Sequence, residues 1–77
     1  MYFLKSVKNP DITYVGYTTD LRQRFQEHNA GRSIHTAKYM PWSLEFYCAF
    51  RDESKAISFE KFLKSGSGKE FSKKRFW

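Results

Sequence analysis

Apolar and aromatic residues, interrupted by a polar turn, predict two short strands at the start of the chain. Residues 1–6 are mostly apolar or aromatic and indicate the first strand. A turn follows at residues 8–11, where Asn and Asp can bond to the local backbone and Pro10 cannot continue a strand ladder. Residues 12–17 are largely β-branched or aromatic and predict the second strand. We therefore expect an antiparallel hairpin.

The next segment, residues 21–29, has the spacing of a short helix. Leu21 and Phe25 lie four positions apart and therefore share one face, which we expect to be buried. The polar residues 18–20 are candidates for the N-cap, and residues 29–31 have the Asn-Ala-Gly composition of a helix C-cap.

A third strand is expected at residues 44–50, after a polar loop over residues 32–43 that Pro41 and Trp42 close. The apolar character of this strand is nearly continuous, which favours a central position covered on both faces. We expect Trp42 to pack over the loop. Cys48 is the single cysteine of the chain, and in this apolar run it is expected to be a small buried residue.

A second helix is predicted from Ser54, as its cap, through Lys64. Its apolar stripe consists of Ala56, Phe59 and Leu63. The Gly/Ser-rich residues 65–68 should stop this helix, and residues 69–75 can form one short basic helix. We expect the aromatic side chains of Phe71, Phe76 and Trp77 to cover the core or to form a partner surface.

The predicted element order β-β-α-β-α, with a short C-terminal helix, defines an α+β fold. We expect one domain over residues 1–77, with helices flanking a small three-stranded antiparallel sheet. A chain of 77 residues has no room for a cleft between two lobes.

Composition narrows the function classes. The chain has 14 Lys and Arg against 8 Asp and Glu, a net charge of +6, which suits a polyanionic partner such as nucleic acid. One cysteine excludes an internal disulfide framework and a cysteine-rich zinc site. No apolar run approaches the roughly 20 residues of a membrane span, so we expect a soluble cytoplasmic protein without a membrane partner.

Arg24 and His28 lie four residues apart on the first predicted helix and therefore share a face. They flank the stripe formed by Leu21 and Phe25, so we expect them to emerge at the edge of the sheet. Taken singly, each has a plainer interpretation. Arg24 can be a solvated or phosphate-contacting side chain, and His28 can interact with the dipole at the helix C-terminus.

Glu60 lies on or beside the apolar stripe of the second predicted helix. A carboxylate in that position must be paired, bind a metal ion or sit at the edge of the stripe. The plainer interpretation is an edge glutamate that pairs with Lys64, four residues further along.

Tyr2 and Tyr14 fall in the two strands of the predicted hairpin, and a suitable register places their hydroxyls together on one face. Tyrosines in strands more often serve packing, which is the alternative here. Gly16 interrupts the second strand pattern, which weakens a strand unless the backbone must approach another group closely.

Taken together, these residues resemble the GIY-YIG nuclease domain over nearly the whole chain. The resemblance rests on Tyr2-Phe3, on Tyr14-Val15-Gly16, on Arg24 with His28, and on Glu60, in this order and at these spacings. It is closest to small stand-alone members and to the N-terminal domain of UvrC. It implies a metal-dependent endonuclease that uses Mg²⁺ or Mn²⁺. The catalytic residues that it implies are Tyr2, Tyr14, Arg24, His28 and Glu60, with Glu60 as the metal ligand.

The chain departs from the family pattern in three places. No glycine precedes the first signature, which is reduced to Met1-Tyr2-Phe3. Tyr17 stands where some members carry a lysine, and no asparagine follows Asn29, although many members have one downstream.

The chemistry of phosphodiester hydrolysis fits the implied roles. A single glutamate can anchor Mg²⁺, which keeps several waters and takes its other ligands from phosphate. Arg24 can bridge phosphate oxygens as a permanently charged planar donor. The base that activates water can be Tyr2, Tyr14 or His28, and the sequence leaves these alternatives open.

We expect nucleic acid, more readily DNA than RNA, to be the partner, and basic residues of the loop and tail to track its backbone. The alternative for these residues is a solubilising surface. The expected contacts are Gly16, Tyr17, Arg32, Lys38, Lys69, Lys73, Lys74 and Arg75. No additional reader module is recognisable, so cleavage is expected to be structure-guided, weakly specific or directed by a partner protein. The alternative function is a non-catalytic nucleic-acid-binding module, and a monomer or a weak dimer fits either function.

Overall fold

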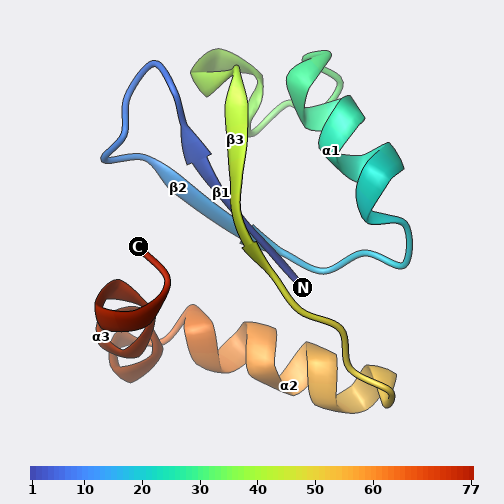
Figure 1. Ribbon diagram of the computed structural model, residues 1–77, viewed down its shortest axis with the longest axis vertical. Helices are drawn as coiled ribbons and strands as arrows, with labels where there is room; N and C mark the ends of the chain where they lie inside the picture. Colours follow the sequence, from blue (N-terminus) through green and yellow to red (C-terminus); the bar gives the residue numbers. More distant parts are fainter.

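The computed structural model describes residues 1–77 and has a three-stranded antiparallel sheet at its centre. The strands are β1 (Tyr2–Ser6), β2 (Thr13–Gly16) and β3 (Trp42–Tyr47), in the spatial order β2-β1-β3. Figure 1 shows β1 between its two neighbours. The structure confirms the predicted hairpin and the three-stranded sheet.

The predicted central position of the third strand is wrong. β1 is the central strand, and its residues Tyr2, Phe3 and Leu4 are at most 1% exposed. β3 lies at an edge, where Tyr47 is 61% exposed. The strand also begins and ends earlier than residues 44–50, because the last part of that apolar run leaves the sheet to meet the next helix.

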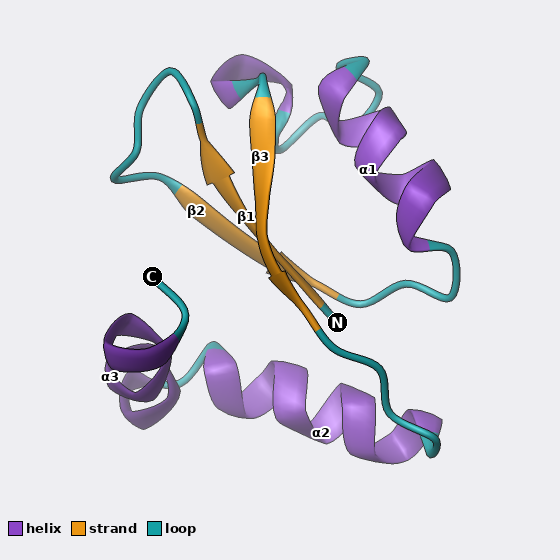
Figure 2. Cartoon of the chain, in the orientation of Figure 1, coloured by secondary structure: helices purple, strands orange, loops and turns teal.

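Two layers of helix cover the sheet (Figure 2). α1 (Leu21–Asn29) lies over one face, and α2 (Glu53–Leu63) and α3 (Gly66–Arg75) lie over the other. The bounds of α1 agree with the prediction, and the carboxylate of Asp20 caps it by accepting the Gln23 N–H at 3.1 Å. A short 3₁₀ turn, η1 (Ala37–Tyr39), interrupts the predicted loop.

The starts of α2 and α3 differ from the predictions. Asp52, rather than Ser54, caps α2, and its carboxylate accepts the Ser54 N–H at 2.9 Å. α3 begins at Gly66 instead of residue 69, and the Ser65 hydroxyl accepts the Gly68 N–H at 3.1 Å. A Cβ on Gly68 would lie 1.8 Å from the carbonyl oxygen of Phe62. The Gly/Ser segment therefore ends α2 and also lets α3 pack directly against it.

Each face of the sheet has its own apolar cluster. On the α1 side, Tyr2, Leu4 and Trp42 pack with Tyr14, Leu21 and Phe25, so the expected packing of Trp42 is confirmed. The cluster on the other side forms around Met1, Phe3 and Leu63. Its half-buried members include Cys48, Phe71, Phe76 and Trp77, which confirms that the C-terminal aromatic residues cover the core. None of the helices is long and apolar enough to cross a membrane.

Candidate active site

The hairpin register brings the two signature tyrosines together on the α1 face of the sheet. Tyr2 pairs with Gly16, and Leu4 pairs with Tyr14, so the tyrosines are diagonal neighbours whose ring centroids are 6.0 Å apart. A Cβ on Gly16 would lie 2.6 Å from the Tyr2 hydroxyl oxygen and 2.9 Å from a ring carbon of Tyr14. The expected close approach at Gly16 is therefore made by these two tyrosine side chains.

His28 approaches the same point from α1. Its side chain is fully buried, with Nε2 2.9 Å from the Tyr2 hydroxyl oxygen and Nδ1 2.7 Å from the Thr36 hydroxyl oxygen. The expectation that His28 emerges at the edge of the sheet is wrong. The turn of α1 that carries it lies against the sheet, and Tyr2 and Tyr14 fill the space between them.

The hydrogen-bond partners assign the protons along this chain of side chains. We assign the tautomer in which the Thr36 hydroxyl donates to the Ser33 carbonyl oxygen, 3.5 Å away, and accepts from Nδ1–H of His28 at 2.7 Å. Nε2 then carries no proton and accepts the hydrogen bond that the Tyr2 hydroxyl donates. Tyr2, His28 and Thr36 thus form one directed chain, which we call the buried relay.

Thr36 is a site residue to which the sequence assigned no role. It lies in the polar loop, where neither periodicity nor spacing distinguishes it from its neighbours. The loop is held in place by Trp42, whose indole N–H donates to the Thr36 carbonyl oxygen at 3.0 Å. The backbone carbonyl of Trp42 in turn accepts from the Asn29 side chain at 3.2 Å. Only the folded loop brings Thr36 to the histidine.

Burial sets the protonation states of the relay. It raises the pKa of Tyr2 to about 12, an effect that the neighbouring Tyr14 strengthens and the positively charged Arg24 opposes. Burial also lowers the pKa of His28, and the charge of Arg24 lowers it further. At neutral pH the site therefore holds a protonated tyrosine beside a neutral histidine.

Arg24 lies between the buried relay and solvent. Its guanidinium pairs with Glu27 at 3.5 Å, and its side chain is 35% exposed. The nearby Tyr2 hydroxyl raises the pKa of Arg24. The guanidinium thus joins the buried tyrosine to solvent, where a phosphate group can reach it.

Glu60 is held apart from these four residues. It belongs to α2, on the other side of the sheet, and it forms no hydrogen bond or ion pair with Tyr2, Tyr14, Arg24 or His28. Its side chain is 23% exposed and pairs with Lys64 at 3.6 Å, which is the plainer of the sequence interpretations.

The side chains present limit which metal the site suits. No three His, Cys, Asp or Glu residues gather closely enough to form a metal cage. A lone, partly exposed carboxylate such as Glu60 does not suit zinc, which is usually held by three or four protein ligands. It does suit Mg²⁺, which retains several waters and binds through one or two carboxylates together with phosphate.

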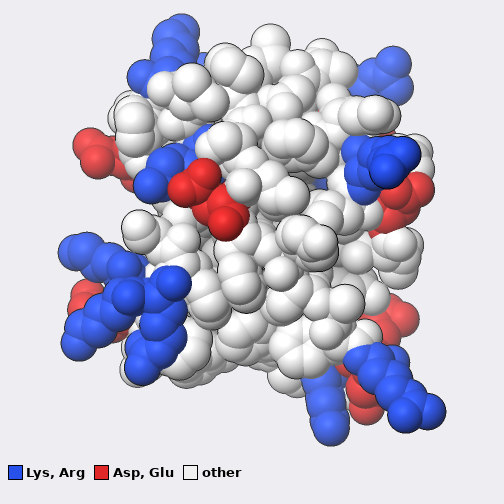
Figure 3. Space-filling view, in the orientation of Figure 1, with Lys and Arg blue, Asp and Glu red and all other residues white.

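The basic residues expected to contact nucleic acid are spread over the surface. Figure 3 shows basic side chains gathered over α3, while the middle of this face is largely uncharged. Arg32 and Lys38 lie on the α1 side, where Lys38 stands 5.3 Å from the ring centre of Tyr39. Arg75 covers the ring of Phe71 at 4.3 Å, and Lys74 is exposed beside it. Tyr17 packs against the cluster of Met1, Phe3 and Leu63.

The sequence is similar to known proteins over nearly its whole length. The family model for the GIY-YIG catalytic domain matches residues 1–75. A UPF0213 protein of Streptococcus pyogenes serotype M3 is 40% identical over 65 residues, which are 83% of this chain and 68% of that protein. A UPF0213 protein of Streptococcus pyogenes serotype M5 is 42% identical over 52 residues, 66% of this chain and 56% of that protein. No solved structure matches the chain significantly.

Proposed function

Because the chain belongs to the GIY-YIG catalytic domain family, we propose that it is an endonuclease that hydrolyses phosphodiester bonds in DNA with a bound divalent metal ion, Mg²⁺ or Mn²⁺. The observation that carries this proposal is the buried relay of Tyr2, His28 and Thr36 beside the partly exposed Arg24. A neutral histidine hydrogen-bonded to a protonated tyrosine, with the Arg24 guanidinium nearby, is suited to proton transfer next to a bound phosphate.

Within this proposal, the two tyrosines have different tasks. Tyr2 is 1% exposed, so it does not reach the attacking water itself. Tyr14 is half-buried and close to Tyr2, which makes it the tyrosine that orients the water. As the proton of the water moves to Tyr14, the Tyr14 proton moves to Tyr2 and the Tyr2 proton moves to Nε2 of His28. His28 is thus the final acceptor, and Thr36 keeps its ring in the correct tautomer.

In this proposal Arg24 and Glu60 both act on the phosphate, which requires the substrate to span the edge of the sheet at β2 between them. Arg24 neutralises negative charge on the non-bridging oxygens as it develops in the transition state. Glu60 would hold the metal ion, which when bound supplies Lewis-acid stabilisation of the phosphate and the leaving oxygen. Glu60 must exchange its partner Lys64 for this ion, and an ion pair that is partly exposed costs little to break.

Cleavage on a panel of labelled substrates tests this function. Duplex, single-stranded, flap and branched DNA are each incubated with Mg²⁺, Mn²⁺ or EDTA, with Glu60→Ala beside the wild type. Glu53→Ala, an exposed glutamate of the same helix, is the matched control. We expect metal-dependent cuts by the wild type and the control, and a rate lower by about 100-fold or more for Glu60→Ala. Equal rates for both variants would refute the role of Glu60.

A second function, a nucleic-acid-binding module without catalysis, is favoured by two observations. Glu60 pairs with Lys64 rather than with the relay, and no asparagine follows Asn29 to complete the site. A folded wild-type protein that binds the substrates and cuts none of them, with either metal, would establish this function instead.

A further inference from the structure

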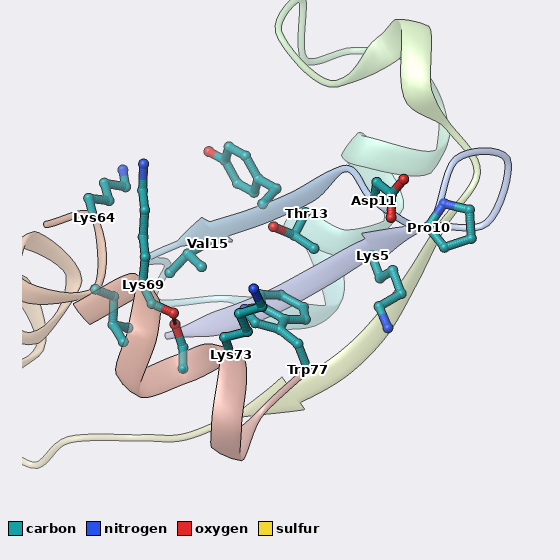
Figure 4. Close-up of a pocket in the computed structure, with 12 residues that line it drawn as sticks. Lys5, Pro10, Asp11, Thr13, Val15, Lys64, Lys69, Lys73 and Trp77 are labelled. Carbon is teal, nitrogen blue, oxygen red and sulfur yellow. Dashed lines mark hydrogen bonds between the residues drawn. The ribbon is translucent and has the colours of Figure 1, made fainter. Parts of the chain in front are cut away.

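A basic groove lies on the opposite face of the sheet from α1 and His28, between β2, the end of α2, and α3. Its volume is about 640 Å³, within the range of sites that accept small ligands. Figure 4 shows the side chains that line it, with Lys64, Lys69 and Lys73 on the helical side and Thr13 and Val15 on β2. These residues come from segments far apart in the sequence.

The charge of the groove is strongly one-sided. Lys5, Lys64, Lys69 and Lys73 all line it, and Asp11 is the one acidic residue among the lining side chains. Lys5 pairs with Glu45 at 3.7 Å and Lys64 with Glu60 at 3.6 Å, so Lys69 and Lys73 are the groove lysines without an ion pair. In Figure 4, Lys64 and Lys69 extend in the same direction, and Lys5 lies toward the opposite end near Pro10. Lysines arranged along a groove in this way suit the successive phosphates of a nucleic-acid strand.

Trp77 gives the groove an aromatic wall. Its indole makes an edge contact with Phe3, with ring centroids 5.5 Å apart, so the ring is anchored on the core. The side chain is only half-buried, and it also lines the groove near Lys73 (Figure 4). Proteins that bind single strands stack unpaired bases on aromatic rings beside a row of cationic side chains, because every base offers a flat face for stacking.

Tyr14 connects the groove to the candidate active site. It lines the groove and also lies against His28, with ring centroids 5.0 Å apart. The Tyr14 side chain packs on the α1 face, whereas Val15 and Trp77 belong to the cluster on the opposite face. A strand that follows the lysines therefore reaches Tyr14 by passing the edge of the sheet at β2. Paired bases within a duplex are stacked on one another and cannot lie on Trp77.

We propose that this groove binds an unpaired nucleotide of the DNA substrate next to the cleaved bond, with its base stacked on Trp77 and its phosphates on Lys64, Lys69 and Lys73. The substrate class is therefore DNA with a single-stranded flap or overhang. This inference rests on the proposed function for the position of the cleaved bond, but the binding itself is measured without catalysis.

Fluorescence anisotropy in EDTA tests the groove. The probes are a blunt DNA duplex and the same duplex with an oligothymidine overhang. Trp77→Leu keeps an apolar side chain against Phe3 but removes the stacking ring. The pair Lys69→Gln/Lys73→Gln removes two groove charges, and Lys55→Gln/Lys61→Gln removes the same charge from α2 outside the groove. Circular dichroism and thermal unfolding check that each variant is folded.

We expect the wild type to bind the overhang probe more tightly than the blunt duplex. Trp77→Leu should weaken overhang binding on the order of tenfold and leave blunt-duplex binding unchanged. Lys69→Gln/Lys73→Gln should lower the slope of log affinity against log salt by about 1.4 on the overhang probe, since each neutralised phosphate of a single strand contributes about 0.7. The α2 control pair should retain the wild-type slope.

Three outcomes would overturn the inference. These are equal binding of the two probes by the wild type, equal losses on both probes for Trp77→Leu, and equal slopes for the two lysine pairs. If Trp77→Leu does not fold, the two lysine-pair variants still test whether the groove binds DNA, because neither pair lies in the core. The proposed function would survive any of these outcomes if the wild type still shows metal-dependent cleavage and Glu60→Ala abolishes it. Groove binding without any cleavage would refute that function alone.

Discussion

At the scale of single residues, the site depends on close contacts around Tyr2. Gly16 faces its ring across the strand pair, and Nε2 of His28 is hydrogen-bonded to its hydroxyl. The sequence indicated both residues, since a glycine within a strand and a histidine four residues after an arginine are visible as patterns. The bond to Thr36 could not be predicted, because it depends on how an irregular loop folds back on α1.

Gly16→Ala should displace Tyr2, because the added methyl group would lie 2.6 Å from the tyrosine hydroxyl oxygen. We expect a loss of about 1–3 kcal/mol in the free energy of unfolding, measured by chemical denaturation. Gly66→Ala is the control, since a methyl group added there would meet no other atom within 4 Å. Equal stability of the two variants would mean that the strand pair tolerates the methyl group.

Stability should fall with acid because His28 is buried in its neutral form. Its pKa in the folded protein is lowered, so the unfolded chain binds more protons once the pH drops below about 6.5. The free energy of unfolding should therefore be constant above this pH and decrease from about pH 6.5 toward the lower folded pKa. Urea unfolding at a series of pH values, followed by tryptophan fluorescence, measures this decrease.

His28→Gln removes the titrating group and should flatten the decrease in that window. His35→Gln, an exposed histidine, is the control and should leave the decrease as in the wild type. The interpretation fails if the wild type and His28→Gln lose the same free energy between about pH 7.5 and about pH 5.5, the range that brackets an ordinary histidine pKa.

At the scale of elements, the clearest pattern led to the most accurate prediction. α1 has its predicted bounds because an apolar pair and caps at both ends define it. The predicted β3 was too late and too central, because the apolar run continues into the segment that leads to α2. The start of α3 was not predicted because glycine and serine usually end helices, whereas here Gly68 allows two helices to touch.

Phe76 follows α3 and should contribute to holding that helix on the sheet. Its ring stacks on Phe46 at 4.3 Å and lies 4.9 Å from Phe3. We expect Phe76→Ala to cost about 2–4 kcal/mol in the free energy of unfolding, since a half-buried ring contributes somewhat less than a fully buried one. Phe62→Ala, whose side chain is 41% exposed, should cost clearly less in the same denaturation experiment. A reversed order would contradict this account of how α3 is held.

At the scale of the whole molecule, the candidate site is assembled from distant segments. The hairpin supplies two tyrosines, α1 supplies Arg24 and His28, and the loop before β3 supplies Thr36. The resemblance to the GIY-YIG family indicated most of this set from the sequence. It did not indicate the basic groove, because the strand and the helices that line it are distant in the sequence and meet only in the folded chain.

The most direct test of the central claim is the single-turnover cleavage rate of Arg24→Ala, measured together with its affinity for the same DNA. Arg22→Ala, an exposed arginine on the same helix, is the control. If the Arg24 guanidinium stabilises the transition state, Arg24→Ala should lower the cleavage rate by about 100-fold or more and keep the affinity within about threefold of the wild type. The cleavage rate of Arg22→Ala should be unchanged. A wild-type rate for Arg24→Ala, or equal losses in both variants, would contradict the assignment of this cluster as the catalytic site.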